Sequence, residues 1–221
     1  MEGKASPPPG LSRLPPGRHG LSREFVAQNQ RDRLTAGIIA AVAEHGYEKT
    51  TITNVVSAAG LSRRTFYAYF KTKEECYLAT CEEIAEHLRG AAKGAEADSD
   101  DWGEKVKARL VAVLAALAAN PDLANFLLVA PARAGGELSE QYSAAVMKAF
   151  VELTGDAPRE IQRLSSAVEY GLAGGSVWLV VRTLDAGEGT RLEELIPDLV
   201  KLILGPYLGH SKAAELSQTS A

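Results

Sequence analysis

The stretch Ala58-Ala59-Gly60-Leu61-Ser62-Arg63-Arg64-Thr65 decides the fold of this chain, because it joins two short segments of helical character. Gly60 allows a turn residue in the left-handed conformation, and Ser62 can cap the helix that follows it. The two small alanines let the helices pack closely, and Leu61 can fill the gap between them. The stretch therefore predicts a helix-turn-helix, with helices over residues 52–59 and 63–70.

The second of these helices carries residue types that suit contact with DNA. Its first residues are Arg63, Arg64 and Thr65, and the N-terminal residues of a recognition helix contact base edges in the major groove. Arginine reads guanine through two hydrogen bonds, while Tyr67 and Tyr69 can donate their hydroxyls to phosphate. The pattern predicts a DNA-binding surface. The alternative is that the aromatic residues form a core and the arginines a solvated face.

Helical periodicity continues on both sides of this pattern, and alternating strand patterns are absent. A helix is predicted from Ser22, a good N-cap, to Gly46, which supplies the stop. Further helices are predicted at about residues 73–93, 106–117, 121 onward, 137–153, 158–184 and 191–208. The fold class is therefore all-α with about nine helices: an N-terminal three-helix helix-turn-helix domain and a larger C-terminal helical domain.

Charge and proline divide the chain. Residues 1–73 hold 11 Lys/Arg against 5 Asp/Glu, a net charge of +6, and residues 74–221 hold 13 against 23, a net charge of −10. Such asymmetry suggests a nucleic-acid-binding segment. A disordered basic, proline-rich tail is expected over residues 1–20, with a minor-groove contact as the alternative. The expected domains are 21–73 for DNA binding and 74–210 for the helical body, followed by a disordered tail over 211–221.

Several classes of protein are excluded by what the sequence lacks. It has no nucleophile elbow, no zinc-protease motif and no phosphate loop, so an enzyme is not expected. Cys76 and Cys81 are five residues apart and fall on different faces of one helix, so neither a metal site nor a cofactor is expected. No signal peptide and no membrane span are predicted, which favours a cytoplasmic protein without a membrane partner.

The combined motifs of residues 31–83 resemble the TetR family of transcriptional regulators. The resemblance rests on Gly46-Tyr47, Thr50-Thr51-Ile52, the turn at 58–62, Thr65-Phe66-Tyr67, Tyr69-Phe70 and Lys73-Glu74-Glu75. It implies base-facing positions at Thr53, Arg63, Arg64 and Ala68, and phosphate-contacting positions at Thr51, Thr65, Tyr67, Tyr69 and Lys73. One departure is Asn54, where an acidic residue that could close a capping box is often found. Another is Val56, where alanine is common.

The resemblance also implies that the C-terminal helices form a homodimer and enclose a small-molecule pocket. Residues 161–181 and 192–203 are apolar on more sides than one domain core needs, which favours a dimer interface; an intramolecular core is the alternative. The expected interface residues are Leu172, Gly175, Leu179, Leu195, Leu199 and Ile203. The expected ligand-lining aromatic residues are Phe126, Tyr142, Tyr170 and Trp178.

These expectations together describe a ligand-responsive regulator. It would bind a palindromic operator in double-stranded DNA as a homodimer, act as a repressor and be released by a small-molecule effector. The alternative is an all-α ligand-binding or protein-interaction dimer that retains the fold without sequence-specific DNA binding.

Overall fold

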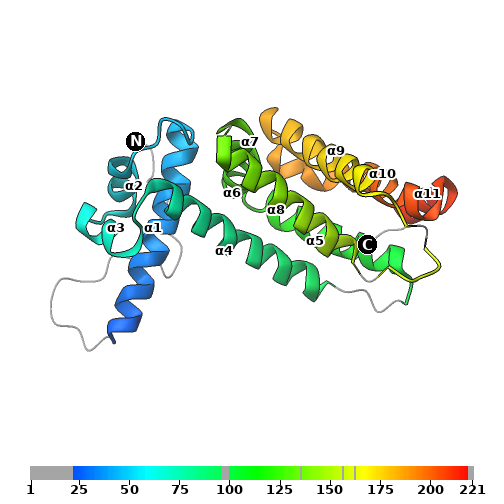
Figure 1. Ribbon diagram of the computed structural model, residues 1–221, viewed down its shortest axis with the longest axis horizontal. Helices are drawn as coiled ribbons and strands as arrows, with labels where there is room; N and C mark the ends of the chain where they lie inside the picture. Colours follow the sequence, from blue (N-terminus) through cyan, green and yellow to red (C-terminus); the bar gives the residue numbers. More distant parts are fainter. Residues whose placement is uncertain (1–21, 96–99, 135, 156, 162, 219–221) are drawn as a thin grey trace. The chain divides into compact units, whose positions relative to one another are not determined.

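The computed structural model describes residues 22–95, 100–134, 136–155, 157–161 and 163–218. The tail expected over residues 1–20 therefore lies outside the described residues. Within them the chain is helical or irregular and contains no strand, which confirms the all-α fold class. The chain divides into two compact units, residues 1–82 and 83–221 (Figure 1).

The N-terminal unit is built from α1 (Arg23–His45), α2 (Ile52–Ala59), α3 (Arg63–Tyr69) and the first turns of α4 (Lys73–Gly94). The predicted caps are confirmed: the Phe25 amide donates to Ser22 Oγ at 3.1 Å, and Gly46 ends α1 with a φ of 74°. Gly60 ends α2 with a φ of 61°, the left-handed turn that the sequence predicts. The side chains of Leu34, Ile38, Val55, Phe66 and Tyr77 are completely buried and form the core of this unit.

The boundary between the two units lies inside α4, nine residues later than the expected boundary after residue 73. Cys76, Tyr77 and Thr80 of α4 are buried, and the Tyr77 ring lies 4.6 Å from the ring of Tyr47 in the loop after α1. The first turns of α4 therefore complete the core of the N-terminal unit. Composition marked the charge boundary but could not reveal this packing.

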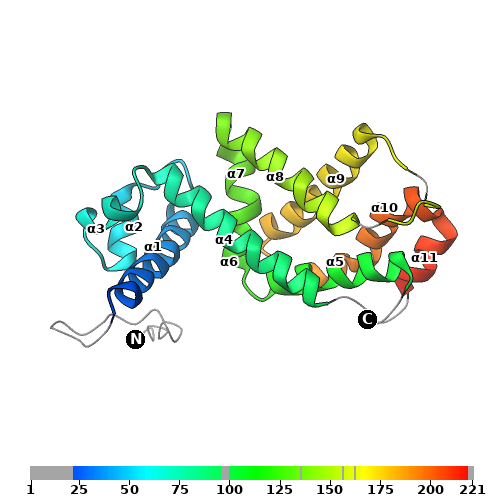
Figure 2. The ribbon, with the colours of Figure 1, turned by 60° about the horizontal axis from the view of Figure 1, so that its bottom comes forward.

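The C-terminal unit holds the rest of α4 and the following helices. In chain order these are α5 (Trp102–Ala118), α6 (Pro121–Ala124), a π-helical turn (Asn125–Val129), α7 (Ala130–Ala134), α8 (Gly136–Thr154), α9 (Ser166–Asp185), a 3₁₀ stretch (Gly189–Leu195), α10 (Ile196–Leu208) and α11 (His210–Gln218). Both α8 and α10 pack against α5 (Figure 2). The core includes Trp102, whose indole N–H donates to the Gly155 carbonyl at 3.2 Å and whose ring meets Tyr207 edge-on.

Three features of the C-terminal unit differ from the expectation. Helix α9 begins at Ser166 rather than near residue 158, with Ser165 as its N-cap, and Ile161 and Leu164 pack against the core from irregular chain before it. The segment expected as one helix over 191–208 is a 3₁₀ stretch followed by α10, with Pro197 in the first turn. Residues 211–218, expected in a disordered tail, belong to α11, which buries Ala213 and Leu216.

No single helix among the described residues is long and apolar enough to cross a membrane. One pair, residues 102–118 and 121–133, reaches the required length and composition only together, and the two helices meet at a bend of 108°.

Candidate nucleic-acid interface

The start of α3 is an open surface that carries two cations. Ser62 caps the helix, since its Oγ accepts from the Thr65 amide at 3.1 Å. Arg63 and Arg64 occupy the first two helical positions and both are exposed. Thr65 is half-buried, and its hydroxyl lies 2.9 Å from Ser62 Oγ. The local structure thus combines free backbone N–H groups, a helix dipole and two guanidinium groups, all favourable for a polyanion.

The remaining residues of α3 separate into an outer and an inner side. Tyr67 and Ala68 are exposed, with Tyr67 at 56%, whereas Phe66 is completely buried and Phe70, the residue after the helix, is 5% exposed. The exposed pairs 63/64 and 67/68 follow each other at a spacing of four positions, which places them on one side of the helix. The structure therefore brings the predicted base-facing residues of α3 together with Tyr67 on one exposed face.

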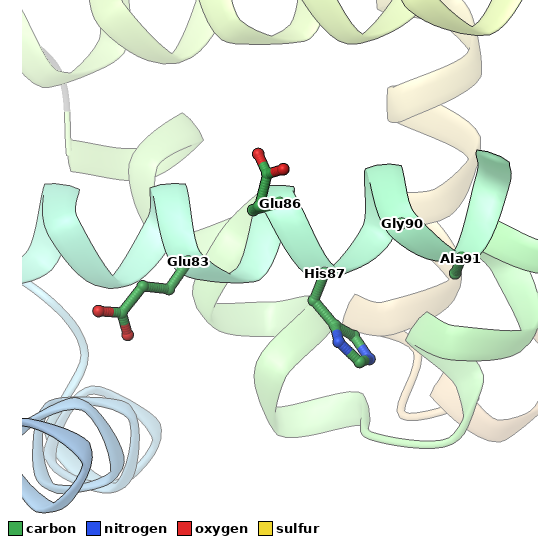
Figure 3. A pocket seen from close by; sticks show the side chains of 5 residues that line it. All are labelled: Glu83, Glu86, His87, Gly90 and Ala91. Atoms are coloured by element: carbon green, nitrogen blue, oxygen red, sulfur yellow. The ribbon is translucent and has the colours of Figure 1, made fainter. Parts of the chain in front are cut away.

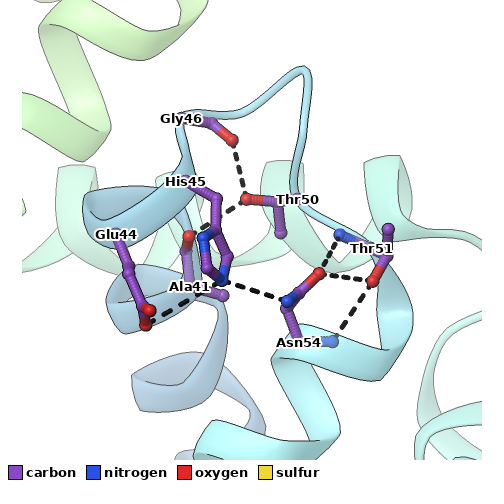
Figure 4. Close-up of polar contacts among 7 residues, drawn as sticks. All are labelled: Ala41, Glu44, His45, Gly46, Thr50, Thr51 and Asn54. Carbon is purple, nitrogen blue, oxygen red and sulfur yellow. Dashed lines mark hydrogen bonds and ion pairs between the residues drawn. The ribbon is translucent and has the colours of Figure 1, made fainter.

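The start of α2 is held by a capping box between Thr51 and Asn54 (Figure 4). Thr51 Oγ1 accepts from the Asn54 amide at 3.3 Å, and Asn54 Oδ1 accepts from the Thr51 amide at 3.0 Å and also from the Thr51 hydroxyl. Asn54 therefore closes the capping box, the role that an acidic residue often has at this position in the family. Thr51 and Thr53 are exposed beside this cap.

The amide of Asn54 makes a further contact that an acidic residue would change. Because Asn54 Oδ1 accepts from Thr51, its Nδ2 is a donor, and it lies 3.0 Å from Nε2 of His45. In this contact His45 Nε2 accepts, an arrangement that uses the tautomer with its ring proton on Nδ1. The Glu44 carboxylate lies 3.8 Å from the same nitrogen. The side chain of Asn54 thus connects the end of α1 to the start of α2.

Two other expected phosphate-contacting residues, Tyr69 and Lys73, have partners in more distant parts of the N-terminal unit. The half-buried Tyr69 donates its hydroxyl to Oε1 of Gln30 in α1 at 3.0 Å. The ammonium group of Lys73 donates to the Tyr47 carbonyl at 2.8 Å and lies 4.1 Å from the centre of the Tyr47 ring. Burial, followed by the nearby carboxylate of Glu74, raises the pKa of Tyr47 to about 12, so this ring stays neutral beside the cation. Both residues hold the unit together in the absence of DNA.

Sequence reasoning missed three residues of α1 that shape this surface. Arg33 donates to the carbonyls of Ala59 and Gly60 in the turn, Gln30 accepts from Tyr69, and Gly37 lets α2 approach α1. Nothing in the helical periodicity of α1 distinguishes these positions from an ordinary polar or small residue. Their roles depend on contacts 18 to 39 positions away in the sequence.

The ligand-lining expectation is corrected for two of its four residues. Tyr170 and Trp178 are 58% and 59% exposed, so they line no interior space of this chain. Phe126 is buried in the core, and Tyr142 is half-buried. Among the described residues the Tyr142 hydroxyl is buried without a hydrogen-bond partner, and burial raises its pKa to about 12.

A shallow depression on α4 is a separate feature. It has a volume of about 570 Å³ and is lined by Glu83, Glu86, His87, Gly90 and Ala91, with Glu83 and His87 pointing to one side and Glu86 to the other (Figure 3). A hydrogen bond from Arg89 lowers the pKa of the Glu86 carboxyl. None of the expected ligand-lining residues contributes to it. Within the described part of the chain no group of three His, Cys, Asp or Glu side chains could hold a metal ion.

The expected dimer interface is also corrected. Leu172, Leu199 and Ile203 are buried in the core of the chain itself, so they are not available to a second copy. Gly175, Leu179 and Leu195 are half-buried, and a Cβ on Gly175 would lie 3.7 Å from Leu202. For Leu172, Leu199 and Ile203 the structure has the intramolecular packing that was the alternative. The exposed apolar side chains of these helices are instead Val168, Tyr170 and Trp178 on α9, with Val151 on α8.

The N-terminal unit is similar in sequence to known DNA-binding regulators. Residues 34–80 match the family model described as bacterial regulatory proteins, tetR family. A curated relative, the uncharacterized HTH-type transcriptional regulator YvdT of Bacillus subtilis (strain 168), is 31% identical over 72 residues. That match covers 32% of this chain and 37% of the relative, so it spans little more than a third of that protein.

The fold is similar to that of solved structures over most of the chain. A TetR family transcription regulator from Marinobacter aquaeolei VT8 has a TM-score of 0.58 at 17% identity, covering 80% of this chain and 97% of the other. A TetR-like transcriptional regulator from Rhodococcus sp. RHA1 has the same TM-score at 15% identity, covering 84% and 97%. At these identities the similarity establishes the fold alone.

Proposed function

Since its N-terminal helices make the chain a member of the tetR family of bacterial regulatory proteins, we propose that it is a transcriptional regulator that binds one double-stranded DNA sequence. The observation that carries this proposal is the exposed start of α3, where Arg63 and Arg64 extend from a capped helix beside Tyr67. Arg63, Arg64 and Ala68, with Thr53 of α2, would face bases. Thr51, Thr65, Tyr67, Tyr69 and Lys73 would face the phosphates.

Tyr69 and Lys73, which contact distant parts of the unit, differ in how well they could also bind a phosphate. Lysine has three N–H donors, and Lys73 donates one of them to the Tyr47 carbonyl. Tyr69 donates its hydroxyl to Gln30, and the same oxygen keeps lone pairs but no second proton. We therefore favour Lys73 over Tyr69 as a direct phosphate contact.

The regulator would act as a homodimer through an α9 face, which we define as Tyr170, Gly174 and Trp178. The two aromatic residues are 58% and 59% exposed. On α9, positions 170, 174 and 178 recur every fourth residue and share one side of the helix. A Cβ added at Gly171 or Gly174 would meet nothing within 4 Å, so a second helix has room to approach. Exposed aromatic residues of this kind are typical of interface cores.

Two-fold symmetry predicts a palindromic operator, with the two α3 helices about 34–36 Å apart. The regulator would most simply be a repressor that a small molecule releases. The ligand would shift the population toward a state with displaced α3 helices, and operator affinity would fall by the difference in ligand affinity between the two states. Tyr142 supports this step, because its buried hydroxyl has no partner among the described residues and offers a polar anchor.

The test is selection of bound sequences from random DNA with the full chain, followed by a salt titration of the selected duplex and a scrambled one. A regulator should select a palindrome and prefer it by about a thousandfold or more, with a steep salt dependence for both duplexes. Binding without any sequence preference would leave the alternative of a dimeric binding protein that kept only the fold.

A further inference from the structure

We propose that Gln30 and Arg33 of α1 are positioning residues that hold α3 at its two ends, so that sequence-specific binding depends on two side chains outside the DNA surface. This inference rests on the proposed function of α3 as the DNA-reading helix. It assigns a role to two polar residues that lie one helical turn apart on α1.

The start of α3 is held through the turn that precedes it. At the C-terminus of α2, the Gly60 amide donates to the Ser57 carbonyl at 3.1 Å and the Leu61 amide to the Val56 carbonyl at 2.9 Å. The next carbonyls cannot be satisfied within the helix. Arg33 satisfies two of them: its Nε and one terminal nitrogen donate to Ala59 O at 3.0 and 2.7 Å, and that same nitrogen donates to Gly60 O at 2.8 Å.

This contact sets the direction in which the chain enters α3. Gly60 is followed by only one residue, Leu61, before the N-cap Ser62. A guanidinium that spans two consecutive carbonyls fixes the orientation of both peptide groups, because its donors lie in a rigid plane. The cation also lies at the negative end of the α2 dipole, where it is favourable. Arg33 thus fixes the position of the N-cap without contacting α3 itself.

The end of α3 is held by its last residue. Tyr69 Oη donates to Gln30 Oε1 at 3.0 Å, and the tyrosine is half-buried. Gln30 and Arg33 are separated by three positions, so they project from the same side of α1. The contacts of Gln30 and Arg33 therefore start from one side of α1. One reaches the turn before α3, and the other reaches the last residue of α3.

A helix of only two turns needs polar contacts of this kind to fix its orientation. Helix α3 has seven residues, whereas isolated helices shorter than about 12–15 residues are marginal in water. Its apolar anchors, Phe66 and Phe70, lie four positions apart on a single side. One apolar stripe holds a helix against a core but permits small rotations about the stripe. Polar contacts at both ends oppose such a rotation, and a shift of Arg63 and Arg64 would cost base-specific hydrogen bonds while leaving general attraction to phosphate.

The experiment compares Arg33→Lys, Arg33→Ala and Gln30→Met with wild type in the full chain. Gln28→Ala is the matched control, since Gln28 is an exposed residue of α1 whose side chain donates to Asp32 at 2.7 Å. Affinities are measured for the selected duplex and a scrambled duplex over a range of salt, and hydrogen exchange is measured for the amides of residues 63–69 without DNA. Thermal unfolding identifies a variant that fails to fold. Gln30→Met keeps the length of the side chain and removes the acceptor of the Tyr69 hydroxyl, so it keeps the proposal testable.

We expect each of the three variants to weaken binding to the selected duplex by roughly five- to tenfold, the value of one or two lost hydrogen bonds. Binding to the scrambled duplex and the salt slope should stay unchanged, and exchange in α3 should accelerate. Arg33→Lys should resemble Arg33→Ala, because an ammonium keeps the charge but cannot span both carbonyls.

Equal losses for both duplexes with a salt slope lower by about one would overturn the proposal, since they indicate a direct phosphate contact. Full activity of Arg33→Lys, or unchanged specificity and exchange in Gln30→Met, would also overturn it. A wild-type protein without sequence preference would refute the proposed regulator instead, and the exchange data would still decide whether the two contacts hold α3.

Discussion

Gly37 of α1 and Ala59 of α2 are packed so closely that a methyl group on Gly37 would lie 2.8 Å from the Ala59 Cβ and 2.7 Å from the Val55 carbonyl oxygen. The missing side chain at position 37 is what lets α2 rest on the backbone of α1. The same approach brings the carbonyls of Ala59 and Gly60 within reach of Arg33, one turn earlier on α1. The geometry of the helix-turn-helix therefore depends on Gly37 and Arg33 of α1.

Gly37→Ala should destabilise the protein by about 1–2 kcal/mol. Alanine gains about 1 kcal/mol in helix propensity over glycine, but overpacking costs about 1–3 kcal/mol, and a backbone carbonyl cannot yield as a flexible side chain does. The control is Gly90→Ala in α4, where an added Cβ meets nothing within 4 Å and propensity alone should stabilise. Denaturant unfolding of both variants measures the difference. Equal stabilisation by the two substitutions would contradict the close packing at Gly37.

Asn54→Asp and Asn54→Ala should separate the two contacts of Asn54. The carboxylate of Asn54→Asp can still accept from the Thr51 amide, but it has no proton to donate where Nδ2 now faces His45 Nε2. Asn54→Ala removes both contacts, so it should destabilise the protein by about 1 kcal/mol more than Asn54→Asp does. Denaturant unfolding of both variants measures the difference. Equal losses in the two variants would refute the capping role of Asn54 Oδ1.

The sequence predicted the helix-turn-helix well because its determinants are local. A cap such as Ser62 and a left-handed residue such as Gly60 act within four positions of the chain, so a single sequence displays them. Arg33 and Gln30 contact residues 26 to 39 positions away along the chain, and no local sequence pattern predicts such contacts.

The C-terminal unit was harder to predict because α9 is apolar on more than one side. The sequence showed that this segment is apolar on several sides but not which side the core takes. Packing against α8, α10, the π-helical turn and the 3₁₀ stretch places Leu172 and Val180 inside and leaves Tyr170 and Trp178 exposed. Helix α11 was missed for the opposite reason, since two buried residues in nine give almost no pattern.

Trp178→Glu should convert the proposed dimer to a monomer. The substitution places a charge on the α9 face, and an unpaired charge in a desolvated interface costs several kcal/mol. Sedimentation velocity at several protein concentrations measures the oligomeric state. Phe25→Glu is the control, because Phe25 is 53% exposed but lies on α1 of the other unit. A dimer that survives Trp178→Glu unchanged would place the interface elsewhere.

Arg64→Ala and Lys73→Ala should weaken DNA binding in different ways. Loss of a bidentate contact from Arg64 to a base should cost about 1–3 kcal/mol and relax the sequence preference at one base pair of each half-site. Loss of Lys73 should weaken all sequences alike and lower the salt slope by about one. Binding of a set of single-base operator variants by both proteins measures the contrast. Identical profiles for the two variants would contradict the separation of base and phosphate contacts.

Tyr142→Phe should stabilise the ligand-free protein, whereas Tyr207→Phe should destabilise it. Burial raises the pKa of both phenols to about 12, so both are neutral at physiological pH. They differ in their partners: the Tyr207 hydroxyl donates to Glu169 Oε1 at 3.1 Å, and the Tyr142 hydroxyl is buried without a partner among the described residues.

An unsatisfied buried hydroxyl costs about 1–3 kcal/mol, and a satisfied one contributes about 0.5–1.5 kcal/mol, or more when its acceptor is charged. The unfolding midpoint should therefore rise in Tyr142→Phe and fall in Tyr207→Phe. If Tyr142 anchors an effector, Tyr142→Phe should bind that effector more weakly. A higher effector concentration would then be needed to release this variant from DNA, so its stability rises while its response to the effector falls. A lower unfolding midpoint in Tyr142→Phe would mean that its hydroxyl already has a partner in solution, and the case for Tyr142 as the effector anchor would fail.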